Sequence, residues 1–409
     1  MPHKYFAVSA RGIEPVTAAE LEQLGAQAIR AVHGGVHFEG DIDLLYRASL
    51  WLRTASRILR PLREFAAQNY EMLYSQTRRV RWEDFLDASK TLAVQATIEG
   101  AAKRAAESAA SSPPPPGRRE RYRGKESNRK VPKRGIDHTM YAALKVKDAI
   151  VDRLRREQGS RPDVDKENPD ITVHAHFSAG RCTLSLDATG SSLHERGYRS
   201  KKAAAPLKET LAAAIIKLTG WDGRQPLFDP MCGSGTLVIE AAQQAMQIAP
   251  GLSRRTFGFQ RWPEFDGKAW SKAVDAARKQ KLSAPPCEII ASDIDPDAIL
   301  TATDNARRAG LEDVIRFEVR KFEDATPPTS APGIIVTNPP YGARLGTNDE
   351  LVPLYKEIGQ VLQTRFNGWQ AYIMAGNLTL ARHIGLTATD RTRLNNGPLE
   401  CRLLKFAVP

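Results

Sequence analysis

The chain has 409 residues, a formal net charge of +12 and a pI near 9.5. This length allows two or three domains with separate cores, and the charge favours a polyanionic partner over an acidic small molecule, although it could also serve solubility alone. The four cysteines lie far apart without a Cys-x-x-Cys pair, which argues against a zinc site and a disulfide framework. No signal peptide or membrane-length apolar run is present, so we expect a soluble, cytoplasmic protein without a metal.

Residues 1–65 are expected to form a small α/β domain. Residues 5–9 and 36–38 are strand candidates, and Pro15 and Gly25 mark the start and end of a helix between them. Residues 43–59 carry apolar side chains at helical spacing, which predicts a second helix.

Residues 66–187 have the pattern of a second domain. Residues 91–98 are a strand candidate, and residues 171–187 predict a hairpin that turns at 178–181. A helix before this hairpin is indicated by apolar residues at helical spacing, namely Met140, Leu144, Val151 and Leu154. His174 and His176 alternate along one strand without a third ligand nearby, so an ordinary strand face explains them better than a metal pair.

A proline-rich and basic insertion interrupts this domain near 101–135. Four consecutive prolines precede residues 118–134, which contain nine Lys or Arg against two Glu. Such a composition predicts a disordered loop. It could be an arm that binds the phosphates of a nucleic acid, because such contacts require little sequence order, or a solvated insertion without a role. We favour the arm.

The residues from 227 to 236 predict a ligand-binding turn. A short apolar strand ends at Asp229, and Gly233 and Gly235 allow a tight turn before an Ala-rich helix. No Lys follows the last glycine as in a P-loop, and the next acid that ends a strand comes too late for a dinucleotide fingerprint. Asp229 would repel phosphate but suits the ammonium group of a methionine-derived cofactor, so S-adenosylmethionine is the preferred ligand.

The alternation of strands and helices continues beyond this turn. Residues 288–293 form the second strand, whose terminal Asp293 could accept both ribose hydroxyls of the cofactor. Residues 314–319 form the third strand. This alternation implies a mainly parallel sheet with ligands at the strand C-terminal ends. Aromatic residues between the first two strands are expected to pack rather than contact a base: Trp262, Phe265 and Trp270.

A further apolar strand leads into the motif Asn338-Pro339-Pro340-Tyr341. The prolines remove two backbone donors and stiffen the loop, which leaves the carbonyls of Asn338 and Pro339 free to accept hydrogen bonds. Acceptors beside the ring of Tyr341 suit an aromatic exocyclic amine, because accepting its N–H bonds directs its delocalised lone pair toward a methyl group. The motif alone does not choose among guanine N2, adenine N6 and a glutamine amide.

Together, the glycine turn and this motif resemble those of class I amino-methyltransferases that act on nucleic-acid bases. More narrowly, the chain is similar to the THUMP-containing RNA guanine-N2 methyltransferases, typified by the enzyme of the large-subunit 23S rRNA. The similarity extends to residues 193–199, 205–211 and 396–403. Fused members of this family carry a second methyltransferase domain, and the end of this chain at Pro409 leads us to expect the form with a single one.

The resemblance implies an α/β fold with three domains. These are a ferredoxin-like domain at 1–65, a THUMP RNA-binding domain at 66–187, and a Rossmann-like methyltransferase domain at 190–409 with a mainly parallel seven-stranded sheet. The implied reaction is methyl transfer from S-adenosylmethionine to the N2 amine of a guanosine in RNA, with 23S rRNA preferred. A tRNA guanosine, adenine N6 and a non-catalytic RNA-binding assembly role are the alternatives.

The implied catalytic residues are Asn338, Pro339, Pro340 and Tyr341. Family members often place an acid directly after the third strand to bind adenine; Lys321 stands there in this chain, so Asp324 is the candidate, with Phe322 as a ring neighbour. The full set of expected cofactor-binding residues is Asp229, Pro230, Met231, Cys232, Gly233, Ser234, Gly235, Thr236, Asp293, Ile294, Phe322, Asp324 and Asn338.

Overall fold

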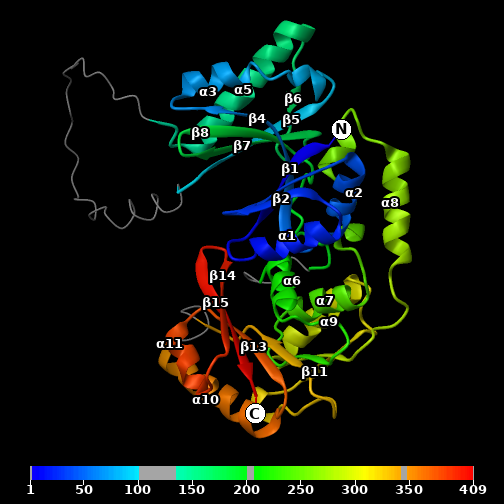
Figure 1. Ribbon diagram of the computed structural model, residues 1–409, viewed down its shortest axis with the longest axis vertical. Helices are drawn as coiled ribbons and strands as arrows, with labels where there is room; N and C mark the ends of the chain where they lie inside the picture. The colour runs from blue at the N-terminus through cyan, green and yellow to red at the C-terminus, as the bar shows by residue number, and fades with distance from the viewer. Residues whose placement is uncertain (1, 101–134, 200–206, 342–347, 409) are drawn as a thin grey trace, which may run out of the picture. The chain divides into compact units, whose positions relative to one another are not determined.

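The computed structural model describes residues 2–100, 135–199, 207–341 and 348–408, which form two compact units (Figure 1). The first unit contains Met1–Ile58, Ser191–Thr256 and Asp266–Pro409, and the second contains Leu59–Gly190 and Phe257–Phe265. The expected basic insertion lies outside the described residues.

The N-terminal segment of the first unit combines antiparallel strands with two helices. β1 and β2 both pair with β3 in antiparallel fashion. The strands expected at 5–9 and 36–38 and the first helix are confirmed. β2 was not predicted, because its side chains lack buried apolar residues in alternation. The elements are β1 (His3–Ser9), α1 (Glu14–Gln23), β2 (Gln27–Val32), β3 (Gly35–Gly40), α2 (Ile42–Trp51) and β4 (Ala55–Ala66).

The helix expected over 43–59 is wrong in its second half. α2 begins after Asp41, whose carboxylate accepts the amide N–H of Leu44 at 2.8 Å, and it ends at Trp51. The amides of Arg53 and Thr54 donate instead to the carboxylate of Glu20 in α1, at 3.2 and 3.1 Å. This contact between distant parts of the sequence turns the chain into β4.

The remainder of the first unit is built on a mixed seven-stranded sheet, ordered β11-β10-β9-β12-β13-β15-β14 (Figure 1). The five strands from β11 to β13 are parallel, as expected, whereas β15 is antiparallel to both β13 and β14. The strands are β9 (Leu227–Asp229), β10 (Ile289–Asp293), β11 (Ile315–Val319), β12 (Ile334–Thr337), β13 (Gln370–Ala375), β14 (Asp390–Asn396) and β15 (Leu399–Ala407).

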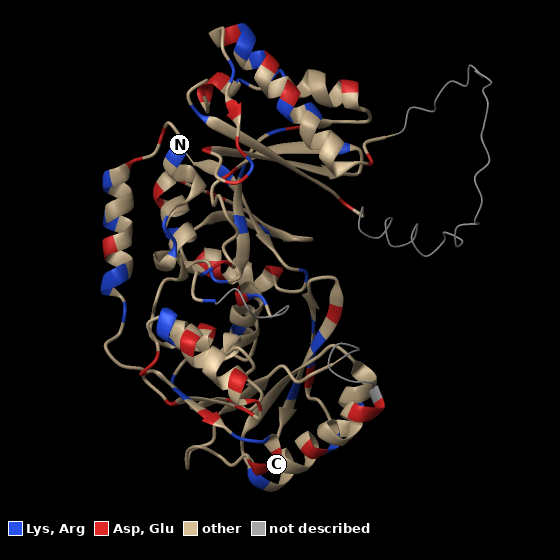
Figure 2. Ribbon diagram, turned by 180° about the vertical axis from the view of Figure 1, so that it is seen from behind, with Lys and Arg blue, Asp and Glu red and all other residues tan. Residues whose placement is uncertain are grey.

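Helices cover both faces of this sheet and produce two hydrophobic cores. Leu227 of β9 lies in the core formed with α6, α7 and α9, and its neighbour Phe228 lies in the core formed with α10 and α11. α9 and α10 carry several charged residues (Figure 2), whereas the sequences of β12 and β13 contain none. These helices are α6 (Glu209–Leu218), α7 (Thr236–Ala245), α9 (Pro296–Arg308), α10 (Asn348–Arg365) and α11 (Leu378–Ala381).

The segment between α7 and β10 packs through its aromatic residues, as expected. In the first unit, α8 (Gly267–Lys279) places Trp270 edge-on against Tyr46 of α2, with ring centroids 5.6 Å apart. In the second unit, Trp262 is buried and Phe265 contacts Phe259, with ring centroids 6.1 Å apart. These rings therefore belong to the packing of their units.

The second unit is an α+β fold with strand order β4-β8-β7-β5-β6. The β7–β8 hairpin and the strand at 91–98 are confirmed, and α5 packs on β5 and α3. β5 and β7 are parallel, whereas β8 is antiparallel to both β4 and β7. Its elements after β4 are α3 (Tyr70–Thr77), β5 (Thr91–Ile98), α5 (Thr139–Gln158), β6 (Asp163–Val164), β7 (Ile171–Ser178) and β8 (Arg181–Asp187).

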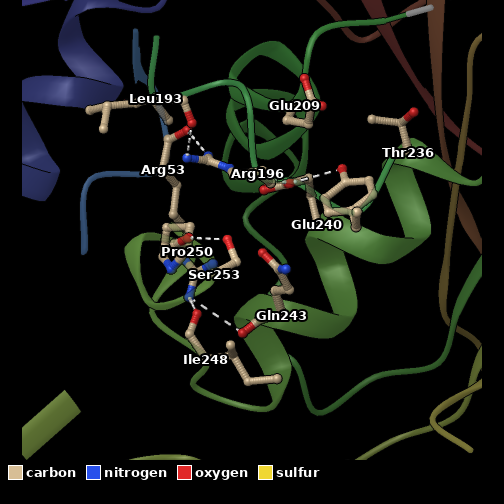
Figure 3. Close-up of polar contacts among 12 residues, drawn as sticks. Arg53, Leu193, Arg196, Glu209, Thr236, Glu240, Gln243, Ile248, Pro250 and Ser253 are labelled. Carbon is tan, nitrogen blue, oxygen red and sulfur yellow. Dashed lines mark hydrogen bonds and ion pairs between the residues drawn. The ribbon is translucent and has the colours of Figure 1, made fainter. Parts of the chain in front are cut away.

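Two buried arginines join the N-terminal segment to the helices around the glycine turn within the first unit (Figure 3). Arg53 donates to the carbonyls of Gln243 and Ile248 at 3.3 and 2.7 Å. Arg196 donates to the carbonyl of Arg53 at 2.6 Å and to that of Leu193 at 2.7 Å. Guanidinium donors thus link the first 58 residues to backbone carbonyls in the rest of the unit.

Glu240 of α7 provides the counter-charge for these arginines. Its Oε1 lies 3.6 Å from Nε of Arg196 and accepts a hydrogen bond from the hydroxyl of Tyr198 at 3.1 Å. Burial lowers the pKa of Arg53 to about 10, and the charges of Glu240 and Glu20 oppose this shift. Arg53 therefore stays charged at neutral pH.

Among the described residues, no helix is long and apolar enough to cross a membrane. In the same part of the chain, no group of three or more His, Cys, Asp and Glu side chains is arranged to hold a metal ion.

Replacing Arg196 by Met is expected to destabilise the protein strongly, because it leaves Glu240 buried without its nearest cation. Breaking one side of a buried ion pair costs about 3–5 kcal/mol. Thermal denaturation should show a large fall in melting temperature. Arg224→Met is the control. The side chain of Arg224 is 85% exposed, and its ion pair with Asp222 is long, at 3.8 Å, so its loss should change stability little. Similar falls for both variants would contradict this assignment.

Candidate active site

The glycine turn between β9 and α7 has the geometry expected from the sequence. Gly233 and Gly235 have φ angles of +52° and +78°, in the region where a side chain causes strain. A Cβ atom on Gly235 would lie 3.0 Å from that of Ala302 in α9, whereas one on Gly233 would have no described atom within 4 Å. Gly235 allows close helix packing, and Gly233 leaves open space at the strand ends.

Neighbouring elements hold the backbone of the turn. The amide of Cys232 donates to the carbonyl of Ser292 in β10 at 3.0 Å, and Nδ2 of Asn305 in α9 donates to the carbonyl of Ser234 at 3.0 Å. Burial raises the pKa of the Cys232 thiol well above its usual range, so this cysteine packs rather than reacts.

Arg199 contacts the residue at the end of the glycine turn, Thr236. Its Nη2 donates to the hydroxyl of Thr236 at 2.9 Å, and its Nε lies 3.2 Å from Oε1 of Glu209 in α6. The sequence did not predict Arg199 as a site residue, although it ends one of the stretches on which the family resemblance was based. Nothing in the sequence around Arg199 indicates that it would contact Thr236 or Glu209.

Asp229 is a buried acid with one unsatisfied oxygen. It is 1% exposed, and its Oδ1 accepts the amide N–H of Met231 at 3.2 Å. Its Oδ2 has no hydrogen-bond partner among the described residues. Burial raises the pKa of Asp229 to about 7, because the carboxylate loses its hydration, and the nearby hydroxyl of Thr337 and the amide of Met231 oppose this shift only in part. A cation placed at Oδ2 would satisfy this oxygen and favour the ionised form.

Asp293 at the end of β10 supports the glycine turn directly. Its Oδ2 accepts the amide N–H of Gly233 at 2.8 Å, and its Oδ1 accepts that of Asp295 at 3.1 Å. Each carboxylate oxygen has a second lone pair for another donor. Ile294 follows with 63% of its surface exposed, so it presents an apolar face beside this acid.

The two candidates for adenine contact after β11, Phe322 and Asp324, differ in exposure. The ring of Phe322 is 6% exposed and packs in the core shared with α10, whereas Asp324 is exposed. Lys321 pairs with Glu323 at 3.1 Å, and this partner raises the pKa of Lys321. Asp324 is therefore the accessible member of the expected pair.

Asn338 follows the last residue of β12 and also carries an unsatisfied oxygen. Its buried Oδ1 has no hydrogen-bond partner in the described part of the chain. The carbonyl of Pro340 accepts the hydroxyl of Tyr355 in α10 at 3.2 Å, which anchors the proline pair from the other side. The unsatisfied amide oxygen of Asn338 therefore lies beside a proline pair whose second carbonyl is hydrogen-bonded to α10.

Tyr341 lies between two parts of the chain that sequence reasoning did not connect with it. Its ring contacts Gly376 directly after β13, and its hydroxyl accepts a hydrogen bond from Nδ2 of Asn396 at 3.3 Å. Burial raises the pKa of Tyr341 to about 12, so the hydroxyl stays protonated. The stretch 396–403 was noted for the family resemblance, but nothing in the sequence paired it with the Asn-Pro-Pro-Tyr motif.

Strand order brings the key polar residues to one edge of the sheet. β9 lies between β10 and β12, with Asp229 level with Ala291 and Phe228 level with Ile335. Asp229, Asp293 and Asn338 therefore stand at the C-terminal ends of three neighbouring parallel strands, where ligands bind in open α/β sheets. Together, this sheet order and the glycine turn define a class I methyltransferase domain.

Family models match three parts of the chain. Residues 196–405 match the RMKL-like methyltransferase domain, residues 4–59 the RlmL ferredoxin-like domain, and residues 118–187 the THUMP domain. The chain belongs to the RMKL-like methyltransferase family.

Relatives with similar sequences differ in length. The "Ribosomal RNA large subunit methyltransferase K/L" of Syntrophotalea carbinolica is 43% identical over all of this chain, which spans 54% of that protein. The corresponding protein of Methylococcus capsulatus is 40% identical over all of this chain, which spans 52% of it. A Synechocystis protein named "Putative RNA methyltransferase slr0064" is 39% identical over 99% of this chain and 96% of its own length. The chain thus spans about half of several relatives and nearly all of another.

Two solved structures are similar to this chain over its length. The crystal structure of SMU.472, named a putative methyltransferase complexed with SAH, has a TM-score of 0.84 and 29% identity, covering 100% of this chain and 98% of that one. A structure from Listeria monocytogenes titled a predicted N6-adenine-specific DNA methylase has a TM-score of 0.82 and 29% identity, covering 100% and 97%.

Replacing Asp229 by Asn is expected to stabilise the ligand-free protein more at pH 8 than at pH 5. Because the folded-state pKa of about 7 exceeds the ordinary 3.8, the folded protein keeps a proton that the unfolded chain loses. Wild-type stability should therefore fall from about pH 4 to pH 7 and level off above, whereas the amide does not titrate. Melting temperatures across this range test the difference; a constant offset between the two proteins would refute it.

Proposed function

We propose that the protein transfers a methyl group from S-adenosylmethionine to the exocyclic N2 amine of a guanosine in RNA, with 23S rRNA as the first candidate. The carrying observation is the pair of unsatisfied oxygens, Oδ2 of Asp229 and Oδ1 of Asn338, at the ends of neighbouring strands β9 and β12. The first suits a cation and the second suits a weakly nucleophilic amine.

The residues around the glycine turn fit S-adenosylmethionine. In this proposal, Oδ2 of Asp229 accepts the ammonium group, and the open space at Gly233 admits the amino-acid part. Asp293 and the exposed Ile294 serve the ribose and the adenine face, with Asp324 at the adenine amine. When bound, this cofactor supplies an electrophilic methyl group on a sulfonium. The crystallised relative complexed with SAH supports the choice.

Asn338 would orient the target amine. Its Oδ1 and the carbonyl of Pro339 accept N–H bonds, so that the nitrogen lone pair faces the methyl carbon. Positive charge that develops on the nitrogen during transfer would lie next to these acceptors, which would stabilise it, and one amine proton would then leave to water. The chain contributes positioning and electrostatic stabilisation in a site fixed before reaction.

The THUMP match and the relatives named as ribosomal RNA methyltransferases support RNA as substrate. The net charge of +12 suits phosphate contacts, which could offset the few kcal/mol needed to extrude a stacked base. We also propose the domain division 1–65, 66–187 and 190–409, which the family models at 4–59, 118–187 and 196–405 support.

Nucleoside analysis after incubation with labelled S-adenosylmethionine tests the reaction. Purified protein should place label in N2-methylguanosine of unmodified 23S rRNA. Label only in tRNA would change the substrate, and label in N6-methyladenosine, the base named for the Listeria relative, would change the amine. No label in either RNA, with cofactor binding intact, would favour a non-catalytic assembly role.

Asn338→Ala is expected to lower the single-turnover rate at saturating cofactor by about a hundredfold or more, because the amine loses its orienting acceptor. Calorimetric binding of S-adenosylmethionine should change far less. Asn367→Ala, at an exposed position before β13 in the first unit, is the matched control and should retain the wild-type rate. Undiminished methylation by Asn338→Ala would exclude this mechanism.

A further inference from the structure

We infer that Asn396, in the β14–β15 hairpin, and Gly376, directly after β13, are positioning residues that fix the ring of Tyr341 for the target base. The inference rests on the proposed function, in which Tyr341 contacts the base. It assigns a role in base recognition to the C-terminal hairpin.

Gly376 provides the space that the ring occupies. A Cβ atom at this position would lie 2.2, 2.3 and 2.9 Å from Cδ2, Cε2 and Cγ of Tyr341, so one edge of the ring lies directly against the backbone. The φ angle of Gly376 lies outside the left-handed region, and its backbone conformation therefore does not require glycine. Space for the ring explains why this position has no side chain.

Asn396 fixes the far end of the same ring. Its Nδ2 donates to the hydroxyl of Tyr341 at 3.3 Å, and the Sγ of Cys401 on β15 lies 4.0 Å from that hydroxyl. In the hairpin, Leu394 pairs with Cys401 and Asn396 pairs with Leu399, so both polar groups come from the same end of two adjacent strands.

The near end of Tyr341 is restrained as well. Pro340 precedes it, and the Pro340 carbonyl accepts the hydroxyl of the buried Tyr355. The ring is thus limited at its backbone, along one edge and at its hydroxyl. Such restraint holds an aromatic face in place before substrate arrives, which reduces the ordering that the reaction requires.

A double-mutant cycle tests this arrangement through single-turnover rates at saturating S-adenosylmethionine, with the RNA that the wild-type protein methylates. Asn396→Ala should lower the rate about threefold to tenfold, as expected for one lost hydrogen bond. In the Tyr341→Phe background the same change should have no further effect, because the hydroxyl is already absent. Equal effects in both backgrounds would overturn the role of Asn396.

Asn395→Ala provides the matched control. Asn395 is adjacent on β14 and its side chain points to the opposite face of the strand, so both rates should stay unchanged. Gly376→Ala should lower the rate by about tenfold or more, since the ring must move. Cofactor affinity and melting temperature, measured on each variant, separate loss of positioning from loss of folding.

Crystal structures of Gly376→Ala and Asn396→Ala decide the positioning independently of the reaction. We expect a displaced ring in the first and a rotated or less ordered ring in the second. An unchanged ring in both would overturn the inference even if methylation were confirmed. Absence of RNA methylation by the wild-type protein would instead overturn the proposed function, and the two structures would still report what holds Tyr341.

Discussion

The termination of three adjacent parallel strands at one edge of a sheet is the constraint on which the site depends. β10 ends at Asp293, β9 ends at Asp229, and Asn338 directly follows β12. Three polar residues therefore stand at the same edge, where the backbone leaves the sheet. The surrounding apolar cores remove water from Asp229 and raise the pKa of its carboxyl, so a cation at this edge would stabilise the ionised form. The same sheet thus supplies both the apolar packing and the polar strand ends.

Features encoded by short stretches could be predicted from the sequence. The glycine turn and the β7–β8 hairpin combine residues with strong local preferences, and the parallel strands follow from their alternation with helices. The end of α2 could not be predicted in this way, because the carboxylate of Glu20, more than thirty residues earlier, binds the amides that would have continued the helix. The place of β15 between β13 and β14 likewise depends on pairing across the sheet.

In the candidate site, too, the features of short stretches could be predicted, whereas those that depend on distant parts of the chain could not. Asp229 and Asn338 are recognisable because each ends an apolar strand beside a distinctive loop, but their unsatisfied oxygens become evident only in the folded protein. Phe322 follows its strand as expected and yet lies in the core, since α10 covers that face. The partners of Tyr341 come from later in the chain and share no local pattern with it.

The position of the β14–β15 hairpin sets an order for assembly during synthesis. Chains emerge from the ribosome N-terminus first, and domains begin to fold as they appear. The strands that carry Asp229 and Asp293 are translated well before β15, which must insert between β13 and β14 to complete the sheet. A nascent chain therefore contains the residues of the glycine turn before Asn396 is available to Tyr341. Completion of the surroundings of Tyr341 therefore waits for residues 396–407.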